Sequence, residues 1–236
     1  GGRRGQIMQL DVYDNPAGNY NVAIAGTSGS GKSLLLNEIA AAYLGTGARV
    51  WIIDVGRSYE KACRNFGGSF IEFTENAALS LNPFTLVQDI DEDMELLQPL
   101  LAQMVSPREP LDGFQYSTLG AAIKKTWKAK GNAMRVSDVH DLLATGRLDE
   151  ESRDEDRRLK DLAAMLHPYT RDGAYGKYFE SDATIDFGSD FIVLELEELK
   201  AKKDLQTVVL LIVMYRITRE MYFSRERKKI VIIDEA

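Results

Sequence analysis

The sequence predicts an α/β fold, in which one sheet is flanked by helices and a helical segment is inserted between its strands. Short apolar runs of strand length occur in the first part of the chain and again near its end, whereas residues 89–165 show helical patterns without a convincing strand. A glycine-rich loop joins an early strand to a helix and then to a second strand, which is a βαβ unit. Because neither group of strands is large enough for a sheet of its own, we expect both to share one sheet.

The composition is that of an ordinary globular protein. Of the 236 residues, 44% are hydrophobic and 28% are charged, which disfavours disorder and collagen-like repeats. The net charge of −7 disfavours a protein whose surface serves mainly to bind nucleic acid. Cys63 is the only cysteine, which excludes an internal disulfide framework and a cysteine-based zinc site, and the two histidines have no ligand-spaced partners.

Neither a signal peptide nor a transmembrane helix is expected. The polar, glycine-rich start of the chain is not followed by an apolar segment of the kind that signal peptides contain. The longest apolar run, residues 208–215, is far shorter than the ~20 residues that a transmembrane helix needs. The chain begins without methionine and stops directly after a strand-like run, so we expect it to be a fragment of a longer protein.

The elements of the first part follow from local patterns. In chain order they are an edge strand or hairpin at 6–13, a strand at 21–25, a helix at 32–44, a strand at 50–53, a helix at 59–65 and a strand at 69–73. The run 50–53 is continuously apolar, which is typical of a strand buried on both faces. Gly45 and Gly47 end the first helix.

The remaining elements are mainly helical until the strand pattern returns. They are helices at 91–104, 115–130, 136–143 and 152–166, a strand at 191–196, a helix at 205–223 and a strand at 230–233. We therefore assign residues 1–85 and 189–236 to an α/β core that is truncated at its C-terminal end. Residues 86–188 form a mainly helical insertion.

Residues 26–33 fit the pattern G-x-x-x-x-G-K-[ST] at every fixed position. Glycines let the backbone curl so that successive N–H groups face a polyphosphate, and the following helix adds its N-terminal dipole. Lys32 is expected to reach the β- and γ-phosphates, and the Ser33 hydroxyl to bind Mg²⁺. The residues expected to bind ATP are Gly26, Thr27, Ser28, Gly29, Ser30, Gly31, Lys32, Ser33 and Leu34.

The last strand, 230–233, is followed by two carboxylates, Asp234 and Glu235. A buried strand that ends in Asp places its carboxylate at the edge of the sheet where α/β proteins bind ligands. We expect Asp234 to support Mg²⁺ opposite Ser33, and Glu235 to act as the catalytic carboxylate that orients and deprotonates the attacking water. The adjacent Glu favours a hydrolysing motor-type ATPase over a kinase or small GTPase. The guanine-reading motif N-K-x-D is not present, and the absence of an L-S-G-G-Q segment disfavours the ABC transporter class.

Two weaker signals leave alternatives open. Asp54 follows a buried strand and either touches the nucleotide site or caps the turn before Gly56, and we favour the cap. Arg171 lies in a polar, tyrosine-rich loop at 169–177 and is the in-chain candidate for reaching a phosphate bound by a neighbouring subunit.

The order of these motifs resembles that of the TraC-type conjugation ATPases, within the VirB/Tra group of type IV secretion ATPases. The phosphate loop and the acidic pair are generic to motor ATPases. The D-x-G-x-S-Y segment at 54–59 and the L-N-P-F segment at 81–84 are more specific, and Gly67-Gly68 and the 169–176 loop also match. The resemblance spans nearly the whole chain.

The resemblance implies a RecA-like P-loop domain with a helical insertion that hydrolyses ATP with Mg²⁺. It also implies self-assembly into hexamers or dimers, contact with inner-membrane type IV secretion components, and a place at the cytoplasmic face of the bacterial inner membrane. By position, Lys32 and Ser33 bind phosphate and Mg²⁺, Asp234 supports the metal and Glu235 is catalytic. Sensor and arginine-finger residues usually lie after the acidic pair, so we expect weak turnover from this fragment alone.

Two other functions remain open at this stage. A DNA-translocating hexameric motor of the coupling-protein kind has the same core, although the charge of −7 does not support DNA as a partner. A scaffold that binds nucleotide only to set its oligomeric state would need no catalytic groups, whereas Lys32, Ser33, Asp234 and Glu235 are all present.

Overall fold

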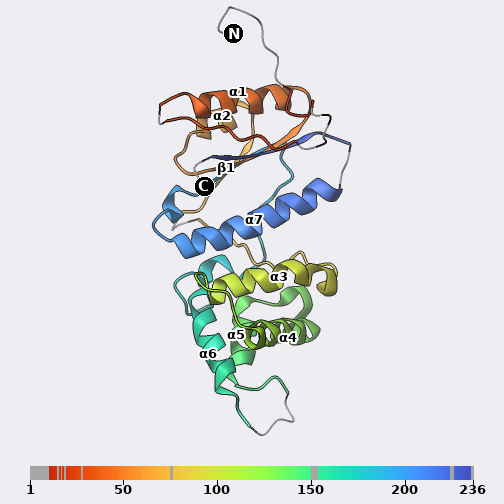
Figure 1. Ribbon diagram of the computed structural model, residues 1–236, viewed down its shortest axis with the longest axis vertical. Helices are drawn as coiled ribbons and strands as arrows, with labels where there is room; N and C mark the ends of the chain where they lie inside the picture. The colour runs from red at the N-terminus through yellow and green to blue at the C-terminus, as the bar shows by residue number, and fades with distance from the viewer. Residues whose placement is uncertain are drawn as a thin grey trace, which may run out of the picture.

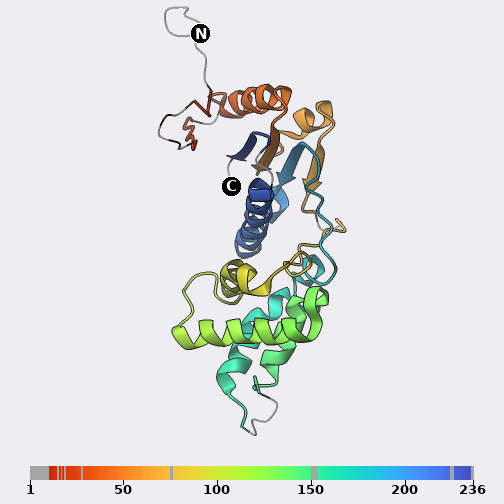
Figure 2. The same ribbon diagram turned by 90° about the vertical axis from the view of Figure 1, so that its right-hand side faces the viewer.

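The computed structural model describes residues 11–14, 16, 18, 20–27, 29–74, 77–149, 154–223 and 226–234. It contains a parallel four-stranded sheet with helices on both faces (Figures 1 and 2). On one side the sheet layer is continued by the helices within residues 90–166, which we call the helical body. This is the predicted α/β class with a helical segment between strands. None of the helices in the described ranges is long and apolar enough to cross a membrane.

The sheet has the strand order β2-β3-β1-β4. The strands are β1 (Arg49–Asp54), β2 (Ser69–Glu72), β3 (Phe191–Glu195) and β4 (Lys229–Asp234). β1 lies in the middle, and Val50 to Asp54 are all buried, which explains its continuous apolar sequence. The two chain segments that were expected to share a sheet do so, because β3 and β4 lie on either side of β1.

The two faces of β1 face different layers. Val50 and Ile52 belong to a core that includes Ala40 of α1 (Lys32–Gly45) and Cys63 of α2 (Glu60–Asn65). Trp51 and Ile53 belong to the larger core that includes α7 (Lys203–Phe223), which crosses the opposite face (Figure 1). α7 has apolar residues on all sides because it is packed between the sheet and the helical body.

The helical body is formed by α3 (Ile90–Val105), α4 (Gly113–Lys130), α5 (Val136–Ala144) and α6 (Arg157–Leu166), which lie between β2 and β3 in the chain. Short 3-10 helices occur at Gly131–Ala133, His167–Tyr169, Gly176–Tyr178 and Glu197–Leu199. Asp93 of α3 accepts hydrogen bonds from Tyr215 and Arg219 of α7, so a polar contact as well as an apolar one joins the helical body to the sheet layer.

The predicted strand at 21–25 is wrong, because residues 20–27 have no regular structure and do not pair with the sheet. Val22 is 53% exposed. Two of the five residues, Ala23 and Ala25, are alanines, which are depleted from strands because they offer little side chain to pack. Of the edge strand or hairpin predicted at 6–13, residues 6–10 lie outside the described part and residues 11–14 form a turn.

Helix and strand boundaries otherwise lie close to those expected, with one clear difference. The helix predicted at 152–166 begins at Arg157, because the Asp156 side chain accepts the N–H of Arg158 and so caps the helix there. Residues 152 and 153 lie outside the described ranges.

Candidate nucleotide-binding site

The glycine-rich loop leads directly into α1, which begins at Lys32. Gly29 and Gly31 have φ angles of 76° and 91°, which are strained for residues with a Cβ. The Ser30 N–H donates to the Thr27 carbonyl at 3.1 Å, which curls the loop. An added Cβ at Gly26 would collide with the Ser30 side chain. The backbone conformation of the loop therefore requires glycine at positions 29 and 31. Ser28 within the loop lies outside the described residues.

Lys32 folds back over the loop. Its Nζ donates to the carbonyl oxygens of Gly26 at 3.0 Å and Thr27 at 3.5 Å, and the residue is half-buried. Leu34 is 68% exposed and lies in the first turn of α1, where backbone N–H groups have no partner within the helix. The loop thus presents a lysine and helix N–H groups on one surface, which is an arrangement that can receive a polyphosphate.

The structure brings Ser33 and Asp234 together across 201 residues of sequence. Ser33 Oγ donates to Asp234 Oδ2 at 3.0 Å, and Asp234 is the last residue of β4 and is 6% exposed. The pair lies where the N-terminus of α1 meets the carboxyl end of the sheet. The neighbouring predicted residue, Glu235, lies outside the described residues.

Each of the four strands ends in a carboxylate. In register, Asp54 lies beside Glu195 on one side and Asp234 on the other, and Glu72 lies beside Glu195. The row therefore follows the edge of the sheet where open α/β proteins bind ligands. Glu72, at the β2 end of the row, forms an ion pair with Arg57.

Asp54 is buried and caps the turn that follows β1. Its Oδ2 accepts the N–H of Ser58 at 2.6 Å. Burial raises its pKa from 3.8 to about 7, and the neighbouring charges of Glu195 and Asp234 act in the same direction against the Ser58 hydrogen bond. Of the two alternatives for Asp54, the turn cap is the one that the hydrogen bonds show.

Two residues of this site were not singled out by sequence reasoning. Glu195 is 2% exposed and accepts backbone N–H groups from Arg57 at 2.7 Å, Glu197 at 2.8 Å and Gly56 at 3.3 Å. Tyr59 is completely buried, and its hydroxyl donates to Asp234 Oδ2 at 2.8 Å. Burial raises the pKa of Tyr59, and the hydrogen bond to Asp234 raises it further. The signals in the sequence are the carboxylate at the end of a strand and the tyrosine of the D-x-G-x-S-Y segment.

The side chains of Ser33 in α1 and Asp234 at the end of β4 fit a magnesium ion. The Ser33 hydroxyl and the Asp234 carboxylate are the hard oxygen donors that Mg²⁺ prefers. A hydroxyl has one hydrogen and two lone pairs, so Ser33 can keep its bond to Asp234 and still offer its oxygen to a metal. No group of three or more His, Cys, Asp or Glu side chains within the described ranges could hold a metal alone, so the remaining ligands would be water and nucleotide phosphates.

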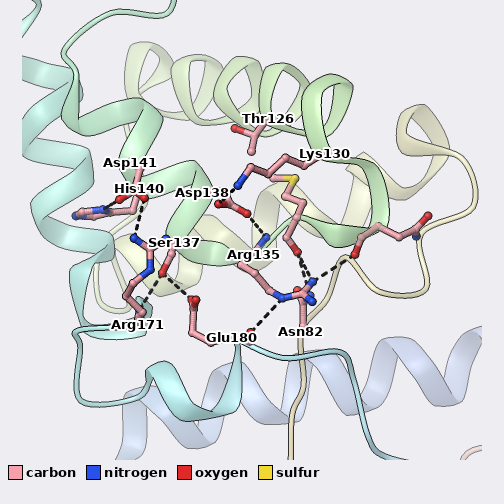
Figure 3. Close-up of polar contacts among 12 residues, drawn as sticks. Asn82, Thr126, Lys130, Arg135, Ser137, Asp138, His140, Asp141, Arg171 and Glu180 are labelled. Carbon is pink, nitrogen blue, oxygen red and sulfur yellow. Dashed lines mark hydrogen bonds and ion pairs between the residues drawn. The ribbon is translucent and has the colours of Figure 1, made fainter.

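Arg171 lies beside α5 in the helical part of the molecule (Figure 3). Figure 1 shows α5 far from α1, whose N-terminus follows the phosphate loop. The Arg171 guanidinium forms an ion pair of 3.0 Å with Asp141 of α5, and its backbone N–H donates to Ser137 Oγ at 2.8 Å. Ser137 in turn donates to Glu180 at 2.6 Å. In this arrangement the guanidinium is directed toward α5, so a role at a neighbouring subunit's phosphate would require the pair with Asp141 to open.

Comparisons with known proteins agree with the resemblance drawn from the motifs. The family model of the TraG P-loop domain matches residues 2–236. Protein TraC of Escherichia coli strain K12 is 33% identical over 239 residues, which cover 98% of this chain and 27% of TraC. The chain therefore spans about a quarter of the length of this curated relative.

Two solved structures share the fold. The structure of VirB4 from Thermoanaerobacter pseudethanolicus superposes with a TM-score of 0.80 at 20% identity, over 99% of this chain and 66% of that one. The bacterial conjugative coupling protein TrwB superposes with a TM-score of 0.58 at 16% identity, over 89% of this chain and 54% of that one. The expected RecA-like P-loop fold is confirmed by these likenesses, and the resemblance to TraC-type conjugation ATPases by the family match and the identity to TraC. The chain belongs to the TraG P-loop domain family.

Proposed function

We propose that the protein is an ATP-hydrolysing motor subunit that energises type IV secretion, conjugative pilus biogenesis and the transfer of DNA or protein. The observation that carries the proposal is the contact of Ser33 with Asp234 beside a glycine-rich phosphate loop at the N-terminus of α1. Membership in the TraG P-loop family and 33% identity to TraC supply the context in which such a site would operate.

Each residue of the site has a separate task in this proposal. Backbone N–H groups of the loop and of the first turn of α1, including those of Gly31 and Leu34, bind the phosphates, and Lys32 neutralises their charge. Ser33 and Asp234 would hold Mg²⁺, which would neutralise negative charge on the phosphates. Glu235 orients the attacking water and accepts its proton.

The wider assembly is also a proposal. Residues 1–85 and 189–236 form the RecA-like core and residues 86–188 the insertion. The full-length protein assembles with itself as a hexamer or as dimers, and it works with inner-membrane type IV secretion components at the cytoplasmic face of the membrane. The likeness to TraC and VirB4 supports this placement.

A DNA-translocating motor is the second candidate, and the likeness to the coupling protein TrwB favours it. The net charge of −7 weighs against it, because proteins that bind DNA strongly neutralise phosphates with Lys and Arg. A third candidate is a scaffold that is gated by nucleotide and has little turnover.

ATP hydrolysis by the full-length protein, with and without DNA and over a range of protein concentrations, distinguishes these functions. We expect the rate of ATP hydrolysis to be unaffected by DNA and to rise more than proportionally with protein concentration, because sites are completed between subunits. Strong stimulation by DNA would favour the translocating motor. Binding of ATP without turnover above that of the Glu235→Gln variant would favour the scaffold.

A further inference from the structure

The hydroxyl of Tyr59 lies at the carboxylate that is proposed to support the metal. It donates a hydrogen bond of 2.8 Å to Asp234 Oδ2, and Ser33 Oγ donates one of 3.0 Å to the same oxygen. The other oxygen, Oδ1, accepts no hydrogen bond from the side chains in the described part of the chain. Two donors therefore restrain one oxygen of Asp234 and leave the other available.

Packing alone does not explain a tyrosine here. Tyr59 is completely buried in the core that contains Ala40, Ile52 and Ile232. A buried hydroxyl needs a hydrogen-bond partner, whereas phenylalanine would fill nearly the same space without that requirement. The partner that Tyr59 finds is Asp234, 175 residues later in the chain.

The turn before Tyr59 is held in an unusual shape. Gly56 and Arg57 have φ angles of 137° and 59°, and an arginine in this region is strained. Two buried carboxylates restrain the turn, since Glu195 accepts the N–H groups of Gly56 and Arg57 while Asp54 accepts that of Ser58. The D-x-G-x-S-Y segment is thus a tightly bonded turn that ends in the residue that contacts Asp234.

We propose that Tyr59 is a positioning residue for the metal site, which acts by fixing the carboxylate of Asp234 through its hydroxyl. This inference rests on the proposed function. It assigns a role to the D-x-G-x-S-Y segment at 54–59, which has no task in that function. Hydrogen bonds to groups that ligate a metal orient those groups, and their removal typically lowers metal affinity by ~10–100-fold. Tyr59 itself touches neither the phosphates nor the metal in this role.

The test uses the Tyr59→Phe variant of the full-length protein. Two quantities are measured: Mn²⁺ binding in the presence of a non-hydrolysable ATP analogue, by electron paramagnetic resonance, and the Mg²⁺ concentration that gives half-maximal ATP hydrolysis. We expect Mn²⁺ affinity to fall and the half-saturating Mg²⁺ concentration to rise by ~10–100-fold. Nucleotide binding in EDTA should stay unchanged, because the phosphate loop is untouched.

Tyr215→Phe is the matched control. It removes a tyrosine hydroxyl that donates to a different carboxylate, Asp93, in the contact between α7 and α3. We expect it to leave both metal readouts at wild-type values. Equal metal affinities in Tyr59→Phe and wild type would overturn the inference, and so would a Tyr59→Phe protein that fails to fold, because the hydroxyl would then serve the fold.

The outcomes for this inference and for the proposed function are distinguishable. A wild-type protein without Mg²⁺-dependent hydrolysis would contradict the proposed function. A wild-type protein that hydrolyses ATP, combined with a Tyr59→Phe variant of unchanged Mg²⁺ and Mn²⁺ dependence, would contradict only the role of Tyr59.

Discussion

Replacement of Glu195 by glutamine tests whether the turn after β1 depends on a buried carboxylate. Glu195 Oε2 accepts the Arg57 N–H at 2.7 Å, and Oε1 accepts those of Glu197 at 2.8 Å and Gly56 at 3.3 Å. Glutamine has the same shape but only one acceptor oxygen. Its NH₂ group must therefore face a backbone N–H on one side, which leaves at least one partly buried donor unsatisfied.

The magnitude follows from the type of bond that is lost. A hydrogen bond to a charged group is worth about 1.5–3 kcal/mol, so we expect Glu195→Gln to lower the free energy of unfolding by about 2 kcal/mol. For a chain of 236 residues this corresponds to a fall in Tm of about 4–8 °C. The change is large for a substitution that alters one atom, because Glu195 is only 2% exposed.

The assay is urea denaturation followed by circular dichroism, with the melting temperature as a second readout. Glu198→Gln is the control, because it makes the same chemical change three residues away at an exposed side chain. It should shift the free energy of unfolding by less than about 0.5 kcal/mol. A Glu195→Gln protein as stable as wild type, or a Glu198→Gln protein equally destabilised, would refute the reasoning.

Three further predictions concern other parts of the molecule. Lys32→Ala removes a charge-assisted contact to phosphate and should weaken ATP binding by about 10–100-fold in a fluorescence titration, and an unchanged affinity would contradict its assignment. Asp54→Asn should stabilise the protein increasingly between pH 4 and pH 8 in EDTA without nucleotide. The pKa of the Asp54 carboxyl is raised from 3.8 to about 7 in the folded protein, so the free-energy penalty of its buried charge is absent below pH 3.8 and complete above about pH 7. A Tm difference between variant and wild type that does not change with pH would contradict this prediction. Arg219→Met removes the positive charge paired with Asp93 and should lower the free energy of unfolding in urea by about 1–3 kcal/mol. This is less than the ~3–5 kcal/mol for fully buried pairs, because the Arg219 side chain is 22% exposed. An unchanged free energy of unfolding would show that the pair does not couple α3 to α7.

The elements that could be predicted from the sequence are those whose signals are local. The run 50–53 is continuously apolar because β1 is covered on both faces, and the start of α1 follows from the phosphate-loop pattern. The strand predicted at 21–25 fails because pairing depends on a neighbouring edge as well as on an apolar run. Small alanine side chains made that run a weak strand former.

The parts of the site that were missed depend on strand order. Glu195 reaches the turn at 56–57 because β3 lies between β2 and β1, and nothing local at residue 195 indicates that neighbour. Tyr59 meets Asp234 only because β4 lies beside β1, and the same adjacency places Asp234 next to Asp54. These contacts join residues far apart in sequence, so a pattern read along the chain identifies the residues but not their partners.

In the proposed function, this P-loop domain hydrolyses ATP at the site formed by the phosphate loop and the end of β4. The most direct test compares ATP binding and phosphate release for the wild-type full-length protein and its Glu235→Gln variant in Mg²⁺. We expect both proteins to bind ATP with similar affinity and only the wild type to release phosphate. Equal phosphate release by the two proteins would contradict the proposed function.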